Sequence, residues 1–260
     1  MVTTPRSNTA TVQITWPLLP DDFVLPDDPV ENQDHPPLAS ALTDALATQS
    51  ELLENALIVS NFALCAGFNN RTICKAPDWM YVRPVKPSLK PRRSYTPHKE
   101  GSVPLIVMEF ISETDGGEYS MESDPSIGKW FFYERVIQIP YYVIFKPEKA
   151  KVEVYRLDGQ LYHKQKPDAD GRYWIEELDL YLGIWEGKHL LRTGNWLRWW
   201  DQAGKCLPWQ EERALQAEEK AIQAEEKAIQ AVEKATDAQL RAEKLAERLR
   251  ELGIDPDQID

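Results

Sequence analysis

The stretch PLIVMEFIS, residues 104–112, places a glutamate inside a continuous run of apolar residues. A short apolar run of this kind is typical of a strand buried in the core of a sheet. Because side chains alternate along a strand, Glu109 shares one face with Val107 and Ile111. A buried carboxylate without a partner is strongly destabilising, so Glu109 requires a cation, a hydrogen-bond network or a metal ion.

A second carboxylate that could meet Glu109 lies in KAPDWMYV, residues 75–82. Asp78 follows Pro77 at the start of a predicted strand, 31 residues before Glu109. If the two strands are neighbours in the sheet, their carboxylates meet at one edge of it. Two negative charges at such a short distance require a divalent cation or a shared proton. Oxygen ligands of this type suit Mg²⁺ or Mn²⁺, which activate water and stabilise charge on a phosphate.

The other segments predict an α/β or α+β domain in which helices flank a mixed sheet. One helix is expected from Asp34, because prolines at 36 and 37 suit a first helical turn. Another is expected from near Asp124 to Ile139, with an apolar stripe at helical spacing. Strands and hairpins are expected in residues 55–67, 71–77, 141–147, 151–157, 160–167 and 172–187.

The net charge argues against non-specific binding to nucleic acid. The net charge is −12, and the first 210 residues and the remainder each carry −6. Neither part is basic, which leaves only a local basic patch for binding to a DNA backbone. The most basic stretch is a predicted exposed loop, residues 84–101, and the side chains expected to track DNA there are Lys86, Lys90, Arg92, Arg93 and Lys99.

The three cysteines, Cys65, Cys74 and Cys206, are an odd number without metal-binding spacing. Reduced thiols are therefore expected, with Cys65 and Cys74 as small apolar residues facing each other across a hairpin. The N-terminus lacks the pattern of a secretory signal. No apolar run approaches the about 20 residues needed to cross a bilayer. We expect a cytoplasmic protein that does not enter the membrane.

Five successive heptads run from Ala214 to Arg248, with small residues alternating by three and four. This period is that of a coiled-coil seam, and Glu and Lys flank it. An alanine seam buries little area, so a homodimer or other helix pairing through it would be weak. The alternative is a single solvated helix stiffened by Glu–Lys pairs. The expected organisation is an extended arm over residues 1–37, a domain over 38–209 and a coiled-coil helix over 210–260.

Four tryptophans fall between Asn195 and Trp209, and those at 196, 199 and 200 recur at helical spacing. We expect a helical hydrophobic brace between the domain and the tail. Stacking on single-stranded bases is the alternative.

Pro77–Asp78, Glu109–Ser112 and Gly128–Lys129 with Tyr133 one turn later resemble the bacterial Uma2 family. The resemblance covers roughly Trp16 to Trp209. It implies the restriction-endonuclease-like fold of the PD-(D/E)xK nucleases, with DNA as the substrate and Mg²⁺ or Mn²⁺ as the cofactor. It further implies that Asp78, Glu109 and the backbone carbonyl of Phe110 bind the metal.

One position departs from the superfamily pattern. The lysine that normally follows the second acid by two residues is replaced by Ile111. Lys129 on the following helix fits a known displacement of this lysine, and it extends the apolar stripe of Tyr133 and Val136. It should therefore point toward the sheet and meet Glu109. Glu31 is a weaker candidate for the accessory acid that the superfamily places near the first helix.

Two functions follow. The first is a metal-dependent endonuclease in which Asp78, Glu109 and Lys129 hydrolyse a phosphodiester bond. The second is an inactive nuclease fold used as a scaffold, whose heptads bind a partner. Each of the three residues has a structural alternative: a turn aspartate, a salt-bridged glutamate and a lysine that reaches solvent. Their occurrence together in this order favours the endonuclease.

Overall fold

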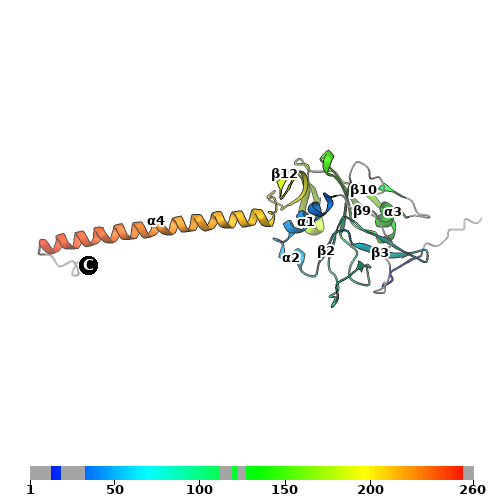
Figure 1. The fold of residues 1–260 in the computed structure, drawn as a ribbon, viewed down its shortest axis with the longest axis horizontal. Coiled ribbons are helices and arrows are strands. Elements are labelled where there is room, and N and C mark those ends of the chain that lie inside the picture. Colours follow the sequence, from blue (N-terminus) through cyan, green and yellow to red (C-terminus); the bar gives the residue numbers. More distant parts are fainter. Residues whose placement is uncertain (1–12, 19–32, 112–118, 122–126, 254–260) are drawn as a thin grey trace, which may run out of the picture. The chain divides into compact units, whose positions relative to one another are not determined.

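The computed structural model describes residues 13–18, 33–111, 119–121 and 127–253. The chain divides into two compact units, Met1–Leu207 and Pro208–Asp260. The first unit is a mixed α+β domain, and the second contains a long helix, α4 (Gln210–Glu251) (Figure 1). The predicted fold class, a mixed sheet with helices and a long C-terminal helix, is confirmed.

The central sheet has six strands in the order β10-β9-β8-β7-β5-β2. Only the β7–β8 pair is parallel, because the chain between these strands crosses over through a helical segment. Strands β7 and β8 are buried almost throughout, which explains their continuous apolar sequences. The strands are β2 (Leu57–Val59), β5 (Trp79–Val82), β7 (Ile106–Phe110), β8 (Tyr141–Lys146), β9 (Lys151–Asp158) and β10 (Leu161–Lys164).

Two smaller sheets complete the first unit. One contains β1 (Ile14–Thr15), β3 (Ala63–Phe68), β4 (Arg71–Lys75) and β6 (Ser94–Tyr95), and the other contains β11 (Tyr173–Ile175), β12 (Leu180–His189) and β13 (Arg192–Trp200). Helix α1 (His35–Leu46) is tied to both β5 and β13. The indole of Trp79 donates to Thr43 Oγ1 at 2.9 Å, and that of Trp199 donates to the Leu42 carbonyl at 3.2 Å. The short helices are α2 (Ser50–Leu53), η3 (Pro147–Lys149) and η4 (Glu176–Leu178).

The described helical segment between β7 and β8 begins at Lys129. Helix α3 (Lys129–Phe131) starts after Gly128 and continues as a π-helical turn, η2 (Phe132–Ile137). The predicted start near Asp124 lies outside the described residues. Gly128 is extended and packs tightly, because a Cβ there would lie 2.1 Å from the Ser120 carbonyl oxygen. This contact fixes where the helix begins and therefore the direction of Lys129.

The tryptophan-rich segment is a strand, so the predicted helical brace is wrong. Strand β13 pairs with β12 along its whole length. Trp196 and Trp199 lie on opposite faces of β13, and both are fully buried. A strand covered on both faces carries apolar residues without alternation, so its tryptophans reproduce a helical spacing by coincidence.

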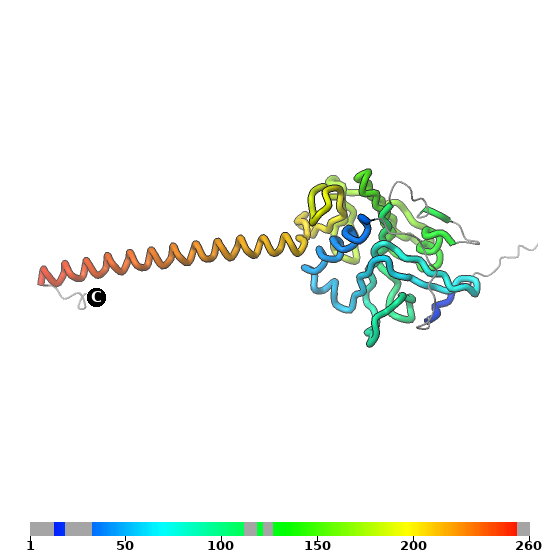
Figure 2. The backbone as a smooth tube through the Cα atoms, in the orientation of Figure 1, coloured from blue at the N-terminus to red at the C-terminus, as the bar shows by residue number. Residues whose placement is uncertain are grey.

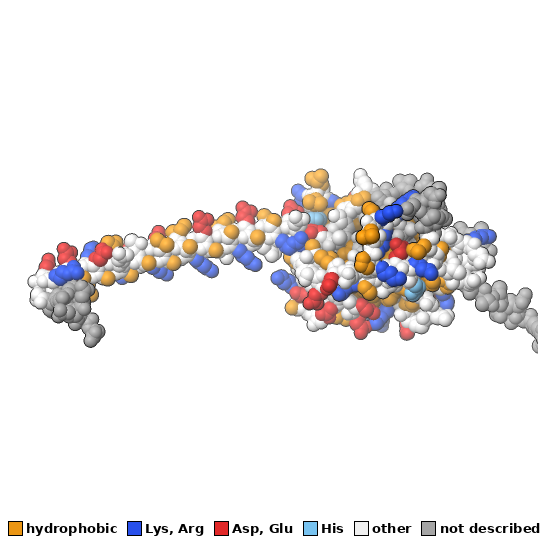
Figure 3. All heavy atoms as spheres, turned by 90° about the horizontal axis from the view of Figure 1, so that it is seen from below, with side chains coloured by type: hydrophobic (Ala, Val, Ile, Leu, Met, Phe, Trp, Pro, Cys, Tyr) orange, Lys and Arg blue, Asp and Glu red, His pale blue; other side chains and the backbone are white. Residues whose placement is uncertain are grey.

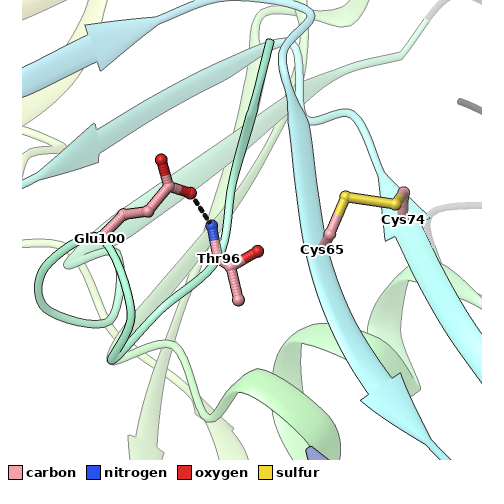
Figure 4. Close-up of a disulfide and its surroundings, with 4 residues drawn as sticks. All are labelled: Cys65, Cys74, Thr96 and Glu100. Carbon is pink, nitrogen blue, oxygen red and sulfur yellow. Dashed lines mark hydrogen bonds between the residues drawn. A yellow bond between two sulfur atoms is a disulfide. The ribbon is translucent and has the colours of Figure 1, made fainter. Parts of the chain in front are cut away.

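The prediction of reduced thiols in the β3–β4 hairpin is also wrong. Cys65 and Cys74 face each other in the antiparallel register and form a disulfide, with their Cα atoms 4.2 Å apart (Figure 4). The sequence spacing placed the two cysteines opposite each other but did not show that their sulfur atoms would bond. The third cysteine, Cys206, has its Sγ atom 3.9 Å from the Leu207 carbonyl oxygen.

Helix α4 has no buried residues. Glu212 caps the N-terminal end of α4, because its carboxylate accepts a hydrogen bond from the Trp209 backbone N–H at 2.9 Å. Acidic side chains follow one edge of the helix and basic side chains follow the other (Figure 3). In the described part of the chain, no helix is both long and apolar enough to cross a bilayer. The exposed large apolar side chains of α4 are Leu215, Ile222, Ile229, Val232, Leu240 and Leu245.

Candidate active site

The register of β5 and β7 brings the two predicted acids together. Trp79 pairs with Met108 in this antiparallel ladder, so Asp78 lies opposite Glu109 one position further along. The backbone N–H of Phe110 donates to Asp78 Oδ2 at 2.6 Å. Asp78 is thereby fixed to the end of the strand that carries Glu109. The predicted adjacency of these two strands is confirmed.

Glu109 is the buried centre of the site, with 1% of its side chain exposed. Its Oε2 atom accepts a hydrogen bond from Lys129 Nζ at 3.0 Å, and its Oε1 atom accepts one from the Tyr133 hydroxyl at 2.8 Å. Burial raises the pKa of Glu109 to about 8, the Lys129 ammonium opposes this rise, and the negative charge of Asp78 adds to it. The cation and the hydrogen-bond network that this buried carboxylate requires are therefore present.

Lys129 and Tyr133 reach Glu109 from one helical segment. They are one turn apart across α3 and η2, so both side chains point at the same face of the sheet. Tyr133 is fully buried, and burial together with the Glu109 charge raises the pKa of its hydroxyl far above the ordinary value. Lys129 keeps 23% of its side chain exposed. Its ammonium therefore joins the buried carboxylate to the outside of the domain.

A family model described as Uma2, putative restriction endonuclease, matches residues 19–193. The chain belongs to the Uma2 family. No curated protein matches it. The family description supports a nuclease-like function that acts on DNA, and nucleases with the restriction-endonuclease-like fold generally depend on a metal ion.

One neighbour of the two acids, His35, was only a weak candidate in the sequence. His35 Nδ1 lies 3.4 Å from Asp78 Oδ1, and 9% of the residue is exposed. The ring of His35 also meets the ring of Phe110 edge to face, with centroids 5.8 Å apart. The only signal was the place of His35 at a helix start before two prolines. That signal does not predict a contact with Asp78, which lies 43 positions later in the chain.

The predicted DNA-contacting loop leaves the sheet at a distance from the acids. Strand β5 runs away from Asp78, so the loop over residues 84–101 begins at the opposite end of that strand and projects from the first unit (Figure 2). Two of its cations bond within the loop. Lys86 Nζ donates to the Lys99 carbonyl at 2.8 Å, and Arg92 Nε lies 3.2 Å from Glu100 Oε1. Glu100 also accepts the Thr96 backbone N–H (Figure 4).

The donor set of the site fits a hard divalent cation. Asp78 and Glu109 supply carboxylate oxygens from neighbouring strands, and such oxygens are the ligands that Mg²⁺ and Mn²⁺ prefer. The described residues hold no cluster of three or more His, Cys, Asp or Glu that could bind a metal ion. Protein ligation would therefore be sparse, as it usually is for Mg²⁺, which retains several waters. Glu31 lies outside the described residues.

Proposed function

We propose that this Uma2 protein is a DNA endonuclease that uses Mg²⁺ or Mn²⁺ to hydrolyse phosphodiester bonds. The observation that carries the proposal is Glu109, a fully buried carboxylate held between Lys129 and Tyr133 and next to Asp78. Two carboxylates and an ammonium gathered at one sheet edge cost stability, and perturbed groups of this type concentrate at functional sites.

Asp78, Glu109 and the Phe110 carbonyl would hold the metal ion. When bound, it would supply positive charge to the scissile phosphate and acidity to a water molecule. The Phe110 N–H and His35 orient the Asp78 carboxylate from two sides. The Tyr133 hydroxyl orients Glu109 in the same way.

Lys129 acts on the substrate. Its ammonium is held 3.0 Å from Glu109 Oε2 and is partly exposed, so it can contact a phosphate oxygen or the attacking water without leaving the site. Water attacks the phosphorus in line and forms a new P–O bond, the P–O3′ bond breaks, and the proton that the water loses is balanced by the proton that the leaving O3′ takes up, so the products are a 5′-phosphate and a 3′-hydroxyl. The ammonium balances the negative charge that gathers on the phosphate in the transition state.

The first test is nicking of supercoiled plasmid by the purified full chain. We expect nicked circles with Mg²⁺ or Mn²⁺, none with EDTA, and recovery when excess metal is restored. Asp78→Asn should reduce the rate about 100-fold or more, because it removes one proposed metal ligand. Asp158→Asn, at the exposed end of β9, is the matched control and should cut like the wild type.

Equal nicking by the wild type and Asp78→Asn would show that any activity arises elsewhere. Complete absence of nicking with every metal and DNA form tested would favour the second candidate function. That function is a scaffold built on the same fold, and the observations that favour it are Ile111 at the usual lysine position and the fully exposed α4.

We further propose that α4 pairs with a second copy of the chain; another helix partner and a single solvated helix are the alternatives. With the alanines 214, 217, 221 and 224 as the seam, Glu218 and Glu225 lie on one flank and Lys220 and Lys227 on the other. Parallel helices place Lys220 next to Glu225 of the second copy, whereas antiparallel helices place lysines together. The charges therefore favour a parallel pair.

Sedimentation equilibrium of the full chain tests this pairing. We expect a concentration-dependent rise to twice the monomer mass. Ala224→Glu with Ala231→Glu should abolish it, because the seam cannot bury four carboxylates in a dimer. Gln223→Glu with Gln230→Glu adds the same charges away from the seam and should leave the dimer intact. A monomer at all concentrations would contradict the pairing.

A further inference from the structure

Three lysines lie on the same face of the central sheet as the candidate active site. We call Lys146, Lys151 and Lys164 the lysine patch. Glu109 pairs with Ile144, and Ile144 pairs with Glu153, so these three residues form one row across β7, β8 and β9. The three lysines occupy the neighbouring rows of the same face. Lys146 pairs with Lys151, and Lys164 pairs with Tyr155.

Glu153 anchors the patch. Its Oε1 atom lies 2.9 Å from Lys151 Nζ and 2.7 Å from Lys164 Nζ, and its Oε2 atom accepts the hydroxyls of Tyr119 and Tyr155 at 2.7 and 3.1 Å. Burial disfavours the ionised form of Glu153, but these hydrogen bonds outweigh burial and lower its pKa to about 2. The carboxylate is thus ionised at all physiological pH values and fixes two ammonium groups.

The patch carries more positive charge than Glu153 neutralises. Lys151 and Lys164 keep 54% and 51% of their side chains exposed. Lys146 lies over the Tyr119 ring at 5.0 Å, and it pairs with no carboxylate among the described residues. Within the patch, three ammonium groups therefore accompany one carboxylate, that of Glu153. The cations of the loop over residues 84–101 differ from those of the patch, because Lys86 and Arg92 form their hydrogen bonds within the loop itself.

The distance from the patch to the acids suits a nucleic-acid strand. Glu153 is two strand spacings from Glu109, which is about 10 Å. One DNA strand advances about 3.4 Å along the helix axis per phosphate. Successive phosphates are farther apart than this axial rise, because the backbone also winds around the axis, so a separation of about 10 Å is within reach of neighbouring phosphates of one strand. A phosphate at the acid pair would place its neighbours over the patch.

We propose that Lys146, Lys151 and Lys164 bind the backbone phosphates next to the one that is cut, and that they hold the DNA strand across β8, β9 and β10. This inference rests on the proposed nuclease function and gives its DNA-binding surface. The patch replaces the loop over residues 84–101 as the main phosphate-binding surface of the chain.

The test is binding of a short fluorescent duplex to the full chain in EDTA, measured by anisotropy over a series of KCl concentrations. The triple variant Lys146→Gln, Lys151→Gln and Lys164→Gln should bind at least about tenfold more weakly. The slope of log K against log salt should fall by about 2 to 3, since each lost phosphate contact removes about 0.9. Substitution of all three by arginine should preserve both values.

Two further variants separate binding from folding and from net charge. Lys146→Gln alone breaks no ion pair among the described residues, and it should reduce the slope by about 1 without changing the thermal midpoint. Gln substitution of Lys188, Lys205 and Lys244 removes the same total charge from other surfaces and should bind like the wild type. Gln substitution of Lys90, Arg93 and Lys99 should have a smaller effect than substitution of the patch.

Wild-type affinity and slope in the patch triple variant, equal losses in the charge-matched control, or no DNA binding by the wild type would each overturn the proposal. Patch-dependent binding without any metal-dependent nicking would support the patch and reject only the nuclease function. Metal-dependent nicking with binding that does not depend on the patch would support the nuclease function and reject the patch.

Discussion

Glu109→Gln is expected to abolish nicking and at the same time to stabilise the metal-free protein. We expect a rate reduction of at least about 1000-fold, because an amide neither binds the cation with its charge nor pairs with the Lys129 ammonium. In EDTA at neutral pH the thermal midpoint should rise. The two effects have opposite signs, which a purely structural carboxylate would not produce.

The gain in stability follows from burial. Only 1% of the Glu109 side chain is exposed, and burial is the main reason that its pKa rises to about 8. Burial on folding therefore destabilises the ionised form of Glu109, which water stabilises in the unfolded chain. Removing that penalty should raise the free energy of unfolding by roughly 2 kcal/mol. For a chain of this size the midpoint would rise by about 4–8 °C.

Glu134→Gln provides the contrast. Glu134 is also buried, but it lies outside the acid pair and accepts the Tyr162 backbone N–H at 2.7 Å and Arg135 Nε at 2.9 Å. Its substitution should lower the thermal midpoint and leave nicking per folded molecule unchanged. Adding millimolar Mg²⁺ should raise the midpoint of the wild type and not that of Glu109→Gln. A destabilised Glu109→Gln that still nicks DNA would identify Glu109 as a structural residue.

The sequence was sufficient to predict the acid–lysine contact because each residue carries its own local constraint. A glutamate in an apolar strand must find a partner, and a lysine on the apolar stripe of a helix must point inward. The crossover between β7 and β8 makes those two requirements meet. For Asp78 the sequence supplied only a condition, that its strand and the strand of Glu109 be neighbours, and the β5–β7 pair meets that condition.

The parts that the sequence did not predict depend on contacts between distant segments. His35 reaches Asp78 only because α1 packs against the end of β5. The rows that join Glu109 to Glu153 exist only once the register of β7, β8 and β9 is known. Composition instead drew attention to the proline-rich basic loop, in which Lys86 donates to the Lys99 carbonyl and Arg92 donates to the Glu100 carboxylate. The lysine patch, in contrast, is assembled from three strands whose register the sequence does not give.

Lys129→Met is the second variant for which we expect a near-complete loss of nicking. Methionine keeps most of the apolar volume of lysine, so the helical segment should still pack while Glu109 loses its ammonium partner. The rate should fall about 100- to 1000-fold, the range found when one transition-state hydrogen-bond donor is removed. Lys149→Met, on the short helix η3, should leave the rate unchanged.

Lys129→Arg separates positioning from charge. Arginine retains the positive charge, but its wider guanidinium does not reproduce the single 3.0 Å contact between Lys129 Nζ and Glu109 Oε2. We expect this variant to bind DNA like the wild type and to cut it more slowly. Lys129→Met combined with Glu109→Gln should cut no more slowly than the slower single variant, because residues that act as one unit lose their function only once. Additive losses would mean that Lys129 and Glu109 act independently, and the shared hydrogen bond would then have no part in catalysis.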